Sequence, residues 1–487
     1  MSAEGPQPAT NALAARVSRV AARAMPSSAK RAVATKGTIG FFASLIMVWI
    51  AFEYGRPPNP MNIPLVISVL LFVGWLLRRP KRWGRQLTGF VLLLVVMAID
   101  IPLAANTYSA FWTTYGTAVL FVFILIPLVQ FIDSVRRMQR LIQTLLVIAL
   151  YVGSWAVLHS GYGPAGAAGG QDENYVAAAM SMAFPFAFFS MFAARSVLAR
   201  VFFAGTAGVV LLACVVSLSR GGALAMGAVL LYCWITSSRR WLGVALVVLL
   251  IGGLALIPDG LTGGGRRTAG VESSSLLARY WGEVKTSTDT TEDTADLRLE
   301  LWQIAFRMFL AHPLSGVGPG NFIWNITKHQ SEEQFDKYGR ELMAFTHSLY
   351  LELLADLGIA GSVLFLMIVY SNFRDLRLVI RRFSRSGRRR PPRPDEGKGG
   401  LSDADRVSVV CYAHAIVASL IGLHVAGAFL PFMYQSYLWT VSTMALAMRH
   451  IAFPPDQAEH PRVGRGQSGG GGSPRTGDRV TSEWQKR

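Results

Sequence analysis

Charged residues are scarce in this sequence, and the signatures of several enzyme classes are missing. Only 16% of the 487 residues are charged, whereas 52% are hydrophobic, a composition unlike that of a soluble globular domain. The three cysteines, Cys214, Cys233 and Cys411, lie far apart within apolar runs, so we predict neither a disulfide framework nor a zinc site. We find no Walker lysine motif, no GxSxG elbow and no HExxH motif, and the long external loop contains no literal DxD metal pair. Any chemistry is therefore expected to need no metal and no nucleotide or other cofactor.

The net charge of +18 does not indicate a nucleic-acid-binding protein. Nucleic-acid recognition needs basic residues gathered on one face and interleaved with aromatics. Here the Lys and Arg residues stand instead beside the ends of hydrophobic runs. This placement is typical of membrane proteins, and we expect membrane lipids rather than nucleic acid as partners.

Apolar runs long enough to span a bilayer recur along the chain. A spanning helix needs about 20 predominantly apolar residues, and we predict an all-α membrane protein with about twelve transmembrane helices. The predicted spans are residues 37–54, 61–77, 88–106, 111–132, 141–158, 174–194, 199–218, 222–237, 241–258, 346–370, 407–429 and 432–449.

The distribution of basic residues predicts the orientation of these spans. Alternate connections are rich in Arg and Lys, as are the tails 1–36 and 450–487 and the loop 371–406, so we place all of these in the cytoplasm. The first tail has no apolar core before the first span, and no cleaved signal peptide is expected. Both tails are of low complexity and are expected to be solvated.

One long loop, residues 259–345, is expected in the periplasm between the ninth and tenth spans. Loops of this length are usually functional or flexible. Its first part is polar and reads as flexible, but the second part contains LRLELWQIAFRMFLA, residues 297–311. This segment predicts an amphipathic helix that ends at His312-Pro313. Its apolar stripe consists of Leu297, Leu301, Ile304, Ala305 and Met308.

Two arginines on the expected outer face are candidates for binding an anion. Arg220 lies in SLSRGGAL, where a basic residue opposes the inside-positive bias. The alternative is an arginine that snorkels at a helix end. Arg298 opens the amphipathic segment, and its planar guanidinium could grip a phosphate with two hydrogen bonds. A solvated surface arginine is the alternative there, and Arg307 is a weaker candidate of the same kind.

His347, in FTHSLYLELLADLGIAG, is the candidate general base. We expect it in the first turn of the tenth span, where the positive end of the helix dipole disfavours imidazolium and leaves a ring that can accept a proton. Glu352 and Asp356 follow with the i, i+4 spacing of one helix face. They could bind substrate or orient His347, although a structural ion pair explains them equally well.

Residues 172–174, Asp-Glu-Asn, stand at the expected start of the sixth span. Capping of that helix is the first interpretation, and sugar binding by Asn174 is the second.

Four of these segments together resemble the O-antigen ligase and O-antigen polymerase superfamily of bacterial envelope enzymes. They are DENYVAAAM, SRGGAL, the R-x3-W segment Arg298–Trp302 with its GVGPGNF turn, and THSLYLELLADLGIAG. The resemblance extends in layout over residues 37–450, including the many spans and the single large periplasmic loop. The long basic insert at 371–406 and the tails depart from a compact member of that superfamily.

The resemblance implies a metal-independent, inverting glycosyltransferase in the bacterial inner membrane whose active site faces the periplasm. The donor would be a glycan on undecaprenyl diphosphate, and the acceptor either lipid A-core in a ligase or another lipid-linked glycan in a polymerase. Arg220 and Arg298 would hold the diphosphate, and His347 would deprotonate the acceptor hydroxyl.

A transporter of lipids or polysaccharides would also have many spans and a few intramembrane charges. We find no sequence duplication, and the candidate charges lie toward one face of the membrane instead of its midplane, which favours the enzyme. A receptor or scaffold would have no need of His347. The choice between ligase and polymerase stays open, because both use the same donor chemistry.

The orientation can be tested with alkaline phosphatase fusions, because that enzyme is active only outside the cytoplasm. A fusion near Thr290 should be active and one near Arg390 inactive. If the Arg390 fusion were active and the Thr290 fusion inactive, the predicted topology would be wrong, and so would the predicted location of the site.

Overall fold

The helices of this chain match the apolar runs of its sequence. A computed structural model describes residues 27–55, 62–164, 172–237, 293–384 and 401–454. The described residues form helices and no strands, which agrees with the all-α class. The predicted span 241–258, the first part of the 259–345 loop and most of both tails lie outside the described residues.

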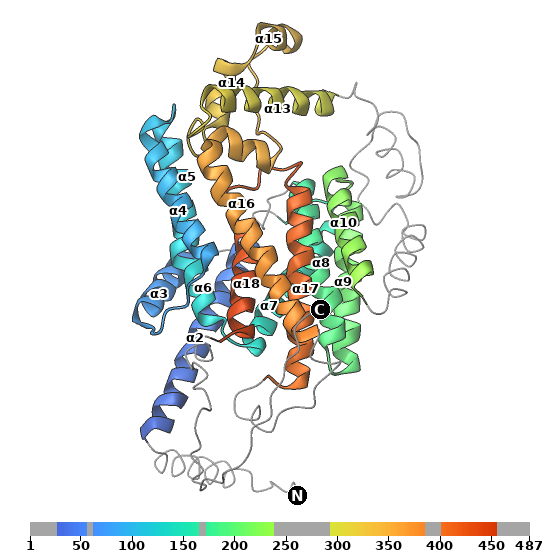
Figure 1. Cartoon of the computed structure of the whole chain (residues 1–487). Helices are drawn as coiled ribbons and strands as arrows, with labels where there is room; N and C mark the ends of the chain where they lie inside the picture. The colour runs from blue at the N-terminus through green and yellow to red at the C-terminus, as the bar shows by residue number, and fades with distance from the viewer. Residues whose placement is uncertain (1–26, 56–61, 165–171, 238–292, 385–400, 455–487) are drawn as a thin grey trace, which may run out of the picture. The chain divides into compact units, whose positions relative to one another are not determined.

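Every predicted span that falls on described residues overlaps a helix (Figure 1). Among the described residues, 8 helical segments are long and apolar enough to cross a membrane, so the chain is a multi-pass membrane protein, and the count of about twelve spans stays a prediction. The helices are α2 (Ser27–Gly55), α3 (Ile63–Leu77), α4 (Arg85–Asp100), α5 (Thr107–Ala118), α6 (Ile126–Phe131), α7 (Val135–Leu158), α8 (Glu173–Ala193), α9 (Val197–Val216), α10 (Arg220–Thr236), α16 (Leu349–Ser384), α17 (Asp403–Ala426) and α18 (Ser436–Ala452).

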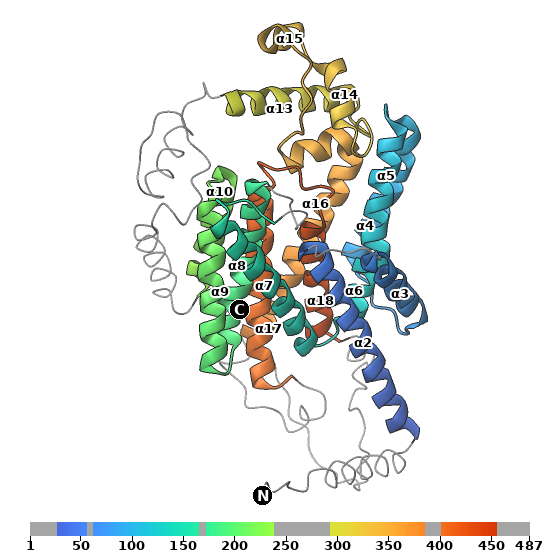
Figure 2. The same ribbon diagram turned by 180° about the vertical axis from the view of Figure 1, so that it is seen from behind.

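The helix α8 lies at the centre of one half of the bundle. It is 83% buried by its neighbours, and it packs against α7, α9, α10 and α17. In the other half, α16 packs against α4, α17 and α18. A π-helical segment, Val119–Leu125, joins α5 to α6. The helices α16 and α17 therefore connect the two halves (Figures 1 and 2).

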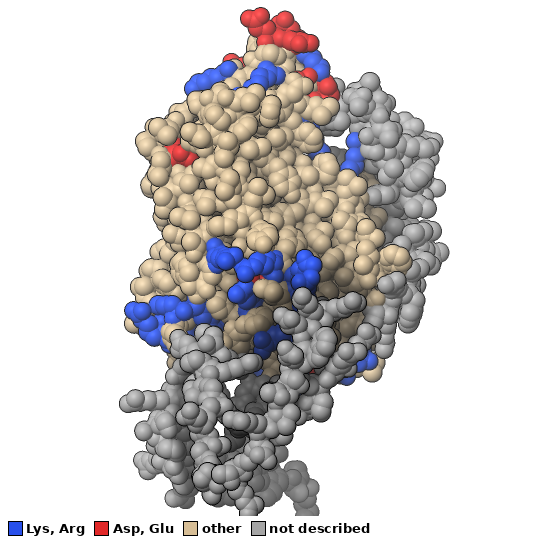
Figure 3. All heavy atoms as spheres, in the orientation of Figure 1, with Lys and Arg blue, Asp and Glu red and all other residues tan. Residues whose placement is uncertain are grey.

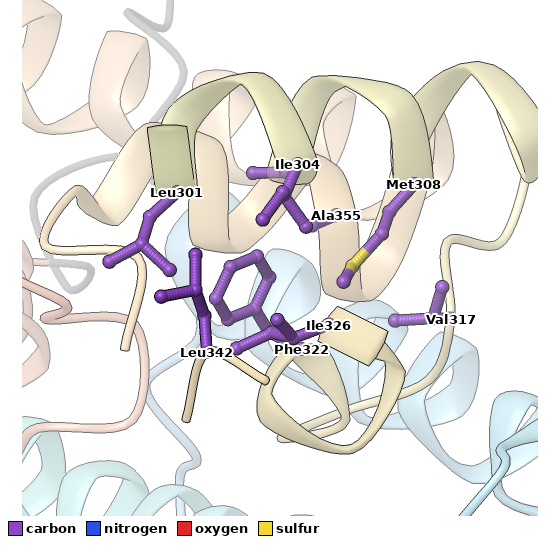
Figure 4. Packing of buried hydrophobic residues seen from close by; sticks show 9 residues of the cluster. Leu301, Ile304, Met308, Val317, Phe322, Ile326, Leu342 and Ala355 are labelled. Carbon is purple, nitrogen blue, oxygen red and sulfur yellow. The ribbon is translucent and has the colours of Figure 1, made fainter. Parts of the chain in front are cut away.

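The second part of the large loop folds into helices at one end of this bundle (Figures 1 and 2). These are α13 (Asp293–Ala311), α14 (Phe322–His329) and α15 (Glu332–Tyr338). The predicted apolar stripe is confirmed: Leu301, Ile304, Ala305 and Met308 are buried, and Leu297 packs against the same cluster. Figure 4 shows this stripe packed on residues of α14, α16 and the turn between α13 and α14.

The helix α16 is broken at Gly358, which the sequence analysis did not foresee. Gly358 has φ 56° and ψ −153°, a conformation that is essentially restricted to glycine. The break frees peptide groups on both sides, and the loop segment 313–318 satisfies them. The amides of Val317 and Gly318 donate to the carbonyls of Ala355 and Asp356, at 2.8 and 2.9 Å.

On the other side of the break the direction of donation is reversed. The amides of Ile359 and Ala360 donate to the carbonyls of Pro313 and Leu314, at 2.9 and 3.2 Å. Unpaired peptide groups are costly in a membrane protein, so this loop segment is an integral part of the α16 structure.

The far end of α16 extends beyond the predicted span. The prediction ended that span at residue 370, whereas the helix continues to Ser384. The continuation is stabilised by polar partners that apolar periodicity cannot reveal. Asp375, which is buried, accepts hydrogen bonds from Gln86 of α4 and Arg449 of α18. Part of the predicted cytoplasmic loop 371–406 is therefore helical.

A band of basic side chains marks the lower end of the visible face, whereas the upper end carries both acidic and basic side chains (Figure 3). In Figure 3, Lys and Arg side chains gather in the lower part of the visible face, and acidic side chains gather at the tip over α15. The basic end also contains the last turn of α16, with Arg381 and Arg382. The orientation of the loop helices and the basic connections relative to the membrane stays a prediction from the sequence.

The break in α16 predicts a specific glycine requirement. A Cβ at Gly358 would lie 2.6 Å from the Leu314 carbonyl oxygen, and the backbone conformation adds strain, so Gly358→Ala should destabilise the protein by about 1 to 3 kcal/mol or more. Thermal unfolding of the detergent-solubilised protein measures this. The control is Gly205→Ala in α9, where no atom lies within 4 Å of the added Cβ and where alanine should be neutral or stabilising. Equal unfolding temperatures for the two variants would contradict the proposed role of the break.

Candidate functional site

The N-termini of α8 and α10 lie side by side and form one wall of the site. The Asp172 carboxylate caps α8 by accepting from the Asn174 amide at 2.6 Å, and Ser219 Oγ caps α10 by accepting from the Gly222 amide at 3.1 Å. Ser219 Oγ also donates to Asn174 Oδ1 at 2.7 Å, which joins the two helix ends. Arg220 is the first residue of α10. The positive ends of two helices and one arginine therefore meet here.

The loop helix α13 contributes Arg298 and Trp302, which lie on one face because they are four residues apart. Trp302 Nε1 donates to the Thr346 carbonyl at 3.0 Å, so this face of α13 meets the segment that contains His347. Arg298 is partly buried, and its guanidinium makes no hydrogen bond or ion pair with a described residue. The R-x3-W spacing thus combines a residue that docks the helix with a cation that is open to a ligand.

The electrostatic environment of Arg298 shows which residues face it. Burial is the main cause that lowers the pKa of Arg298, and the charge of Arg220 lowers it further, while Asp172 acts in the opposite direction. Arg298 and Arg220 are therefore close despite their separation in sequence. Two neighbouring guanidinium groups suit the binding of a polyanion.

His347 lies just before α16, not in its first turn as the sequence analysis expected. The helix begins at Leu349, whose amide donates to the Gly427 carbonyl at 2.7 Å. Thr346 Oγ1 donates to the Ser348 carbonyl at 3.1 Å. These bonds hold His347 in the left-handed region at φ 49°. Such strained backbone persists only where the surroundings fix it, and it is frequent at functional sites.

The His347 ring is expected to be neutral near pH 7. Burial is the first cause that lowers its pKa, the positive charge of Arg298 is the second, and Asp172 opposes both. The predicted direction of the shift is the same, but the helix dipole is the wrong cause, because His347 lies outside the helix that begins at Leu349. The ring makes no hydrogen bond with a described residue, so a nitrogen is free to accept a proton.

Glu352 and Asp356 bind backbone groups rather than each other or an arginine. Glu352 Oε2 accepts from the Met433 amide at 3.1 Å. The Asp356 carboxylate accepts from the amides of Gly320 and Phe322, at 2.8 and 2.9 Å, and from the Tyr434 hydroxyl at 2.9 Å. Both side chains are buried. These contacts favour structural positioning over direct substrate binding for the two acids.

The remaining candidates also have structural partners. The Arg307 guanidinium donates to the His329 carbonyl at 3.0 Å, at the C-terminus of α14, and to Gln303. Asn174 Oδ1 accepts from Ser219. Of the predicted site residues, the structure therefore brings together Arg220, Arg298 and His347, with Asn174 adjacent.

Asp172 belongs to the same cluster, although the sequence indicated only a helix cap. Its charge acts on both Arg298 and His347. The described residues contain no group of three or more His, Cys, Asp or Glu side chains suited to a metal ion.

Residues 205–366 match the family model described as O-antigen ligase. The matched range covers about one third of the chain. The match supports the superfamily resemblance that the sequence motifs indicated, and the matched family implies a membrane enzyme of the glycosyltransferase type. No curated protein matches the chain.

The matched range contains most of the clustered residues. Arg220, Arg298 and His347 lie inside the matched range, as do the broken part of α16 and the turn that satisfies it. Asp172 and Asn174, from α8, lie before it. The helix α8 therefore completes the site from outside the matched range.

The cluster predicts opposite pKa shifts for two substitutions. Arg298→Ala should raise the pKa of His347, because it removes a repelling cation, and Asp172→Asn should lower it, because it removes an attracting anion. Labelling with diethyl pyrocarbonate, which attacks neutral imidazole, gives the titration midpoint when the His347 peptide is quantified by mass spectrometry. The wild-type midpoint should lie below the ordinary value of about 6.5. An unchanged midpoint in Arg298→Ala would show that the arginine does not face His347.

Proposed function

We propose that the protein transfers a glycan from undecaprenyl diphosphate to an acceptor on the periplasmic face of the bacterial inner membrane. The most specific form of this proposal is an O-antigen ligase that joins O-antigen to lipid A-core. The observation that carries it is the placement of Arg298 where it interacts electrostatically with both Arg220 and His347, on the face of α13 that Trp302 docks against the His347 segment. The family match supports the reaction class.

The two arginines suit the leaving group. A diphosphate presents several anionic oxygens, and each guanidinium can donate two parallel hydrogen bonds to them. As the bond between the anomeric carbon and the phosphate oxygen breaks, negative charge accumulates on the diphosphate. Fixed cations and the positive ends of α8 and α10 stabilise that charge in the transition state. Transfer would then proceed without a metal.

His347 suits the acceptor. Its free nitrogen takes the proton from the acceptor hydroxyl while the hydroxyl oxygen attacks the anomeric carbon. One carbon–oxygen bond forms as the other breaks, undecaprenyl diphosphate leaves, and the proton remains on His347 until it passes to solvent. Direct displacement inverts the configuration at the anomeric carbon.

The acceptor distinguishes the ligase from the alternative, a polymerase that extends lipid-linked O-antigen or exopolysaccharide. Deletion of the gene followed by gel analysis of lipopolysaccharide separates them. A ligase deletion removes every glycan-capped species, and a polymerase deletion leaves a cap of one repeat unit. An unchanged gel pattern together with unchanged exopolysaccharide would contradict both forms of the proposal.

Substitutions at the cluster test the mechanism in the purified enzyme. His347→Gln keeps a hydrogen-bonding side chain but no base, and the rate at saturating donor should fall by about 10²- to 10⁴-fold. Arg220→Lys and Arg298→Lys keep the charge but lose the planar fork, and each should lower kcat/KM by about tenfold or more.

Arg340→Lys is the matched control, because Arg340 is an exposed arginine of the same loop. It should transfer glycan at the wild-type rate. A His347→Gln enzyme as fast as the control would exclude the general-base role.

A further inference from the structure

The Asp356 carboxylate is the point where three separate parts of the chain meet. Asp356 lies on α16, only 1% exposed. Its Oδ1 accepts from the Phe322 amide at 2.9 Å. Its Oδ2 accepts from the Gly320 amide at 2.8 Å and from the Tyr434 hydroxyl at 2.9 Å. Gly320 lies in the turn after α13, Phe322 is the first residue of α14, and Tyr434 lies in the connection between α17 and α18.

We propose that Asp356 is a positioning residue that locks the loop helix α13 onto α16 and thereby sets Arg298 against His347. This inference rests on the proposed function, since it assigns Asp356 a role in aligning the two groups that hold the donor and activate the acceptor. The partners of the Asp356 carboxylate are protein groups, so its role is to position other residues.

A series of contacts connects the Asp356 carboxylate to Arg298 and His347. Phe322, whose amide Asp356 binds, packs its side chain in the same cluster as Leu301 and Ile304 of α13 (Figure 4). The same helix α13 also contacts the segment just before α16, because Trp302 Nε1 donates a hydrogen bond to the Thr346 carbonyl. Arg298 stands one turn before Trp302, and His347 follows Thr346 directly. A shift of the turn relative to α16 would therefore move Arg298 relative to His347.

The turn before α14 is held by a second attachment besides Asp356, which joins it to the start of α5. Asn321 Oδ1 accepts from the Asn106 amide at 2.8 Å, and Asn321 Nδ2 donates to the Asn106 carbonyl at 3.2 Å. Gly320 has φ 64°, and a Cβ there would lie 2.5 Å from Thr113 Oγ1. The turn is thus held between the start of α5 and the broken part of α16.

Only a carboxylate satisfies all three donors at this position. An ionised carboxylate is purely an acceptor with about four lone-pair sites, whereas an amide replaces one oxygen with a donor. In Asp356→Asn, the amide nitrogen would face either the Phe322 amide or the Gly320 amide, and one attachment of the turn would be lost. Burying a carboxylate costs free energy. If position 356 served packing alone, a hydrophobic side chain would therefore be more favourable there.

The test measures His347 directly and does not depend on catalysis. The charged groups that act on His347 are Arg298 from α13 and Asp172 at the start of α8, with Arg220 of α10 facing Arg298. In Asp356→Asn, Arg298 should move away and the titration midpoint of His347, measured by labelling and mass spectrometry, should rise toward its ordinary value. Loss of the carboxylate charge alone would lower the midpoint. The direction of the shift in the His347 midpoint therefore distinguishes movement of Arg298 from loss of the Asp356 charge alone.

The matched control is Asp375→Asn, which removes another buried aspartate from the same helix. Asp375 binds Gln86 and Arg449 at the opposite end of α16. This variant should lower the thermal stability but leave the His347 midpoint and the transfer rate per folded molecule unchanged. Asp356→Asn should instead lower the rate at saturating donor by about tenfold to a hundredfold.

Tyr434→Phe keeps the inference testable if Asp356→Asn does not fold. It removes one of the three donors, and it should shift the midpoint in the same direction by a smaller amount. An unshifted midpoint in the folded variant, or an equal shift in Asp375→Asn, would overturn the positioning role. If the wild-type enzyme transferred no glycan, the proposed function would fail, while the midpoint would still decide whether Asp356 sets Arg298 against His347.

Discussion

The site depends on how the peptide groups freed by the break in α16 find partners. A membrane helix cannot leave N–H and C=O groups unpaired, and here the segment 313–318 pairs them in both directions. This requirement ties the loop to the helix that begins beside His347. The GVGPG turn and the break at Gly358 in ADLGIAG therefore form one structural unit. Because α13 precedes the segment directly, its position relative to His347 follows from the same bonds.

The electrostatics of the site follow from this arrangement. Arg220 comes from the bundle and Arg298 from the loop, and their mutual repulsion must be offset by packing and by the attachments of the turn. Asp172 offsets part of the positive charge, and it also limits how far the pKa of His347 falls. An anionic leaving group would complete the balance. In the proposed mechanism, Arg220, Arg298 and a neutral His347 are held together before the substrate binds, and this preorganisation would stabilise the departing diphosphate.

Apolar length and periodicity predicted much of this fold. They located the described spans and the buried stripe of α13, from Leu301 to Met308. The break at Gly358 escaped notice because a glycine within an apolar run gives no sign of its φ angle. At the site, charge and motif predicted that Arg220, Arg298 and His347 belong together. Sequence could not assign Asp356, because its partners are backbone amides and a tyrosine from distant segments.

The most direct test of this account is an experimental structure of the protein with undecaprenyl diphosphate, the product of the proposed reaction. The account predicts that the diphosphate contacts the guanidinium groups of both Arg220 and Arg298, with the His347 ring facing the side from which an acceptor hydroxyl would approach. A diphosphate bound elsewhere on the bundle, with the two arginines turned away from it, would contradict the account.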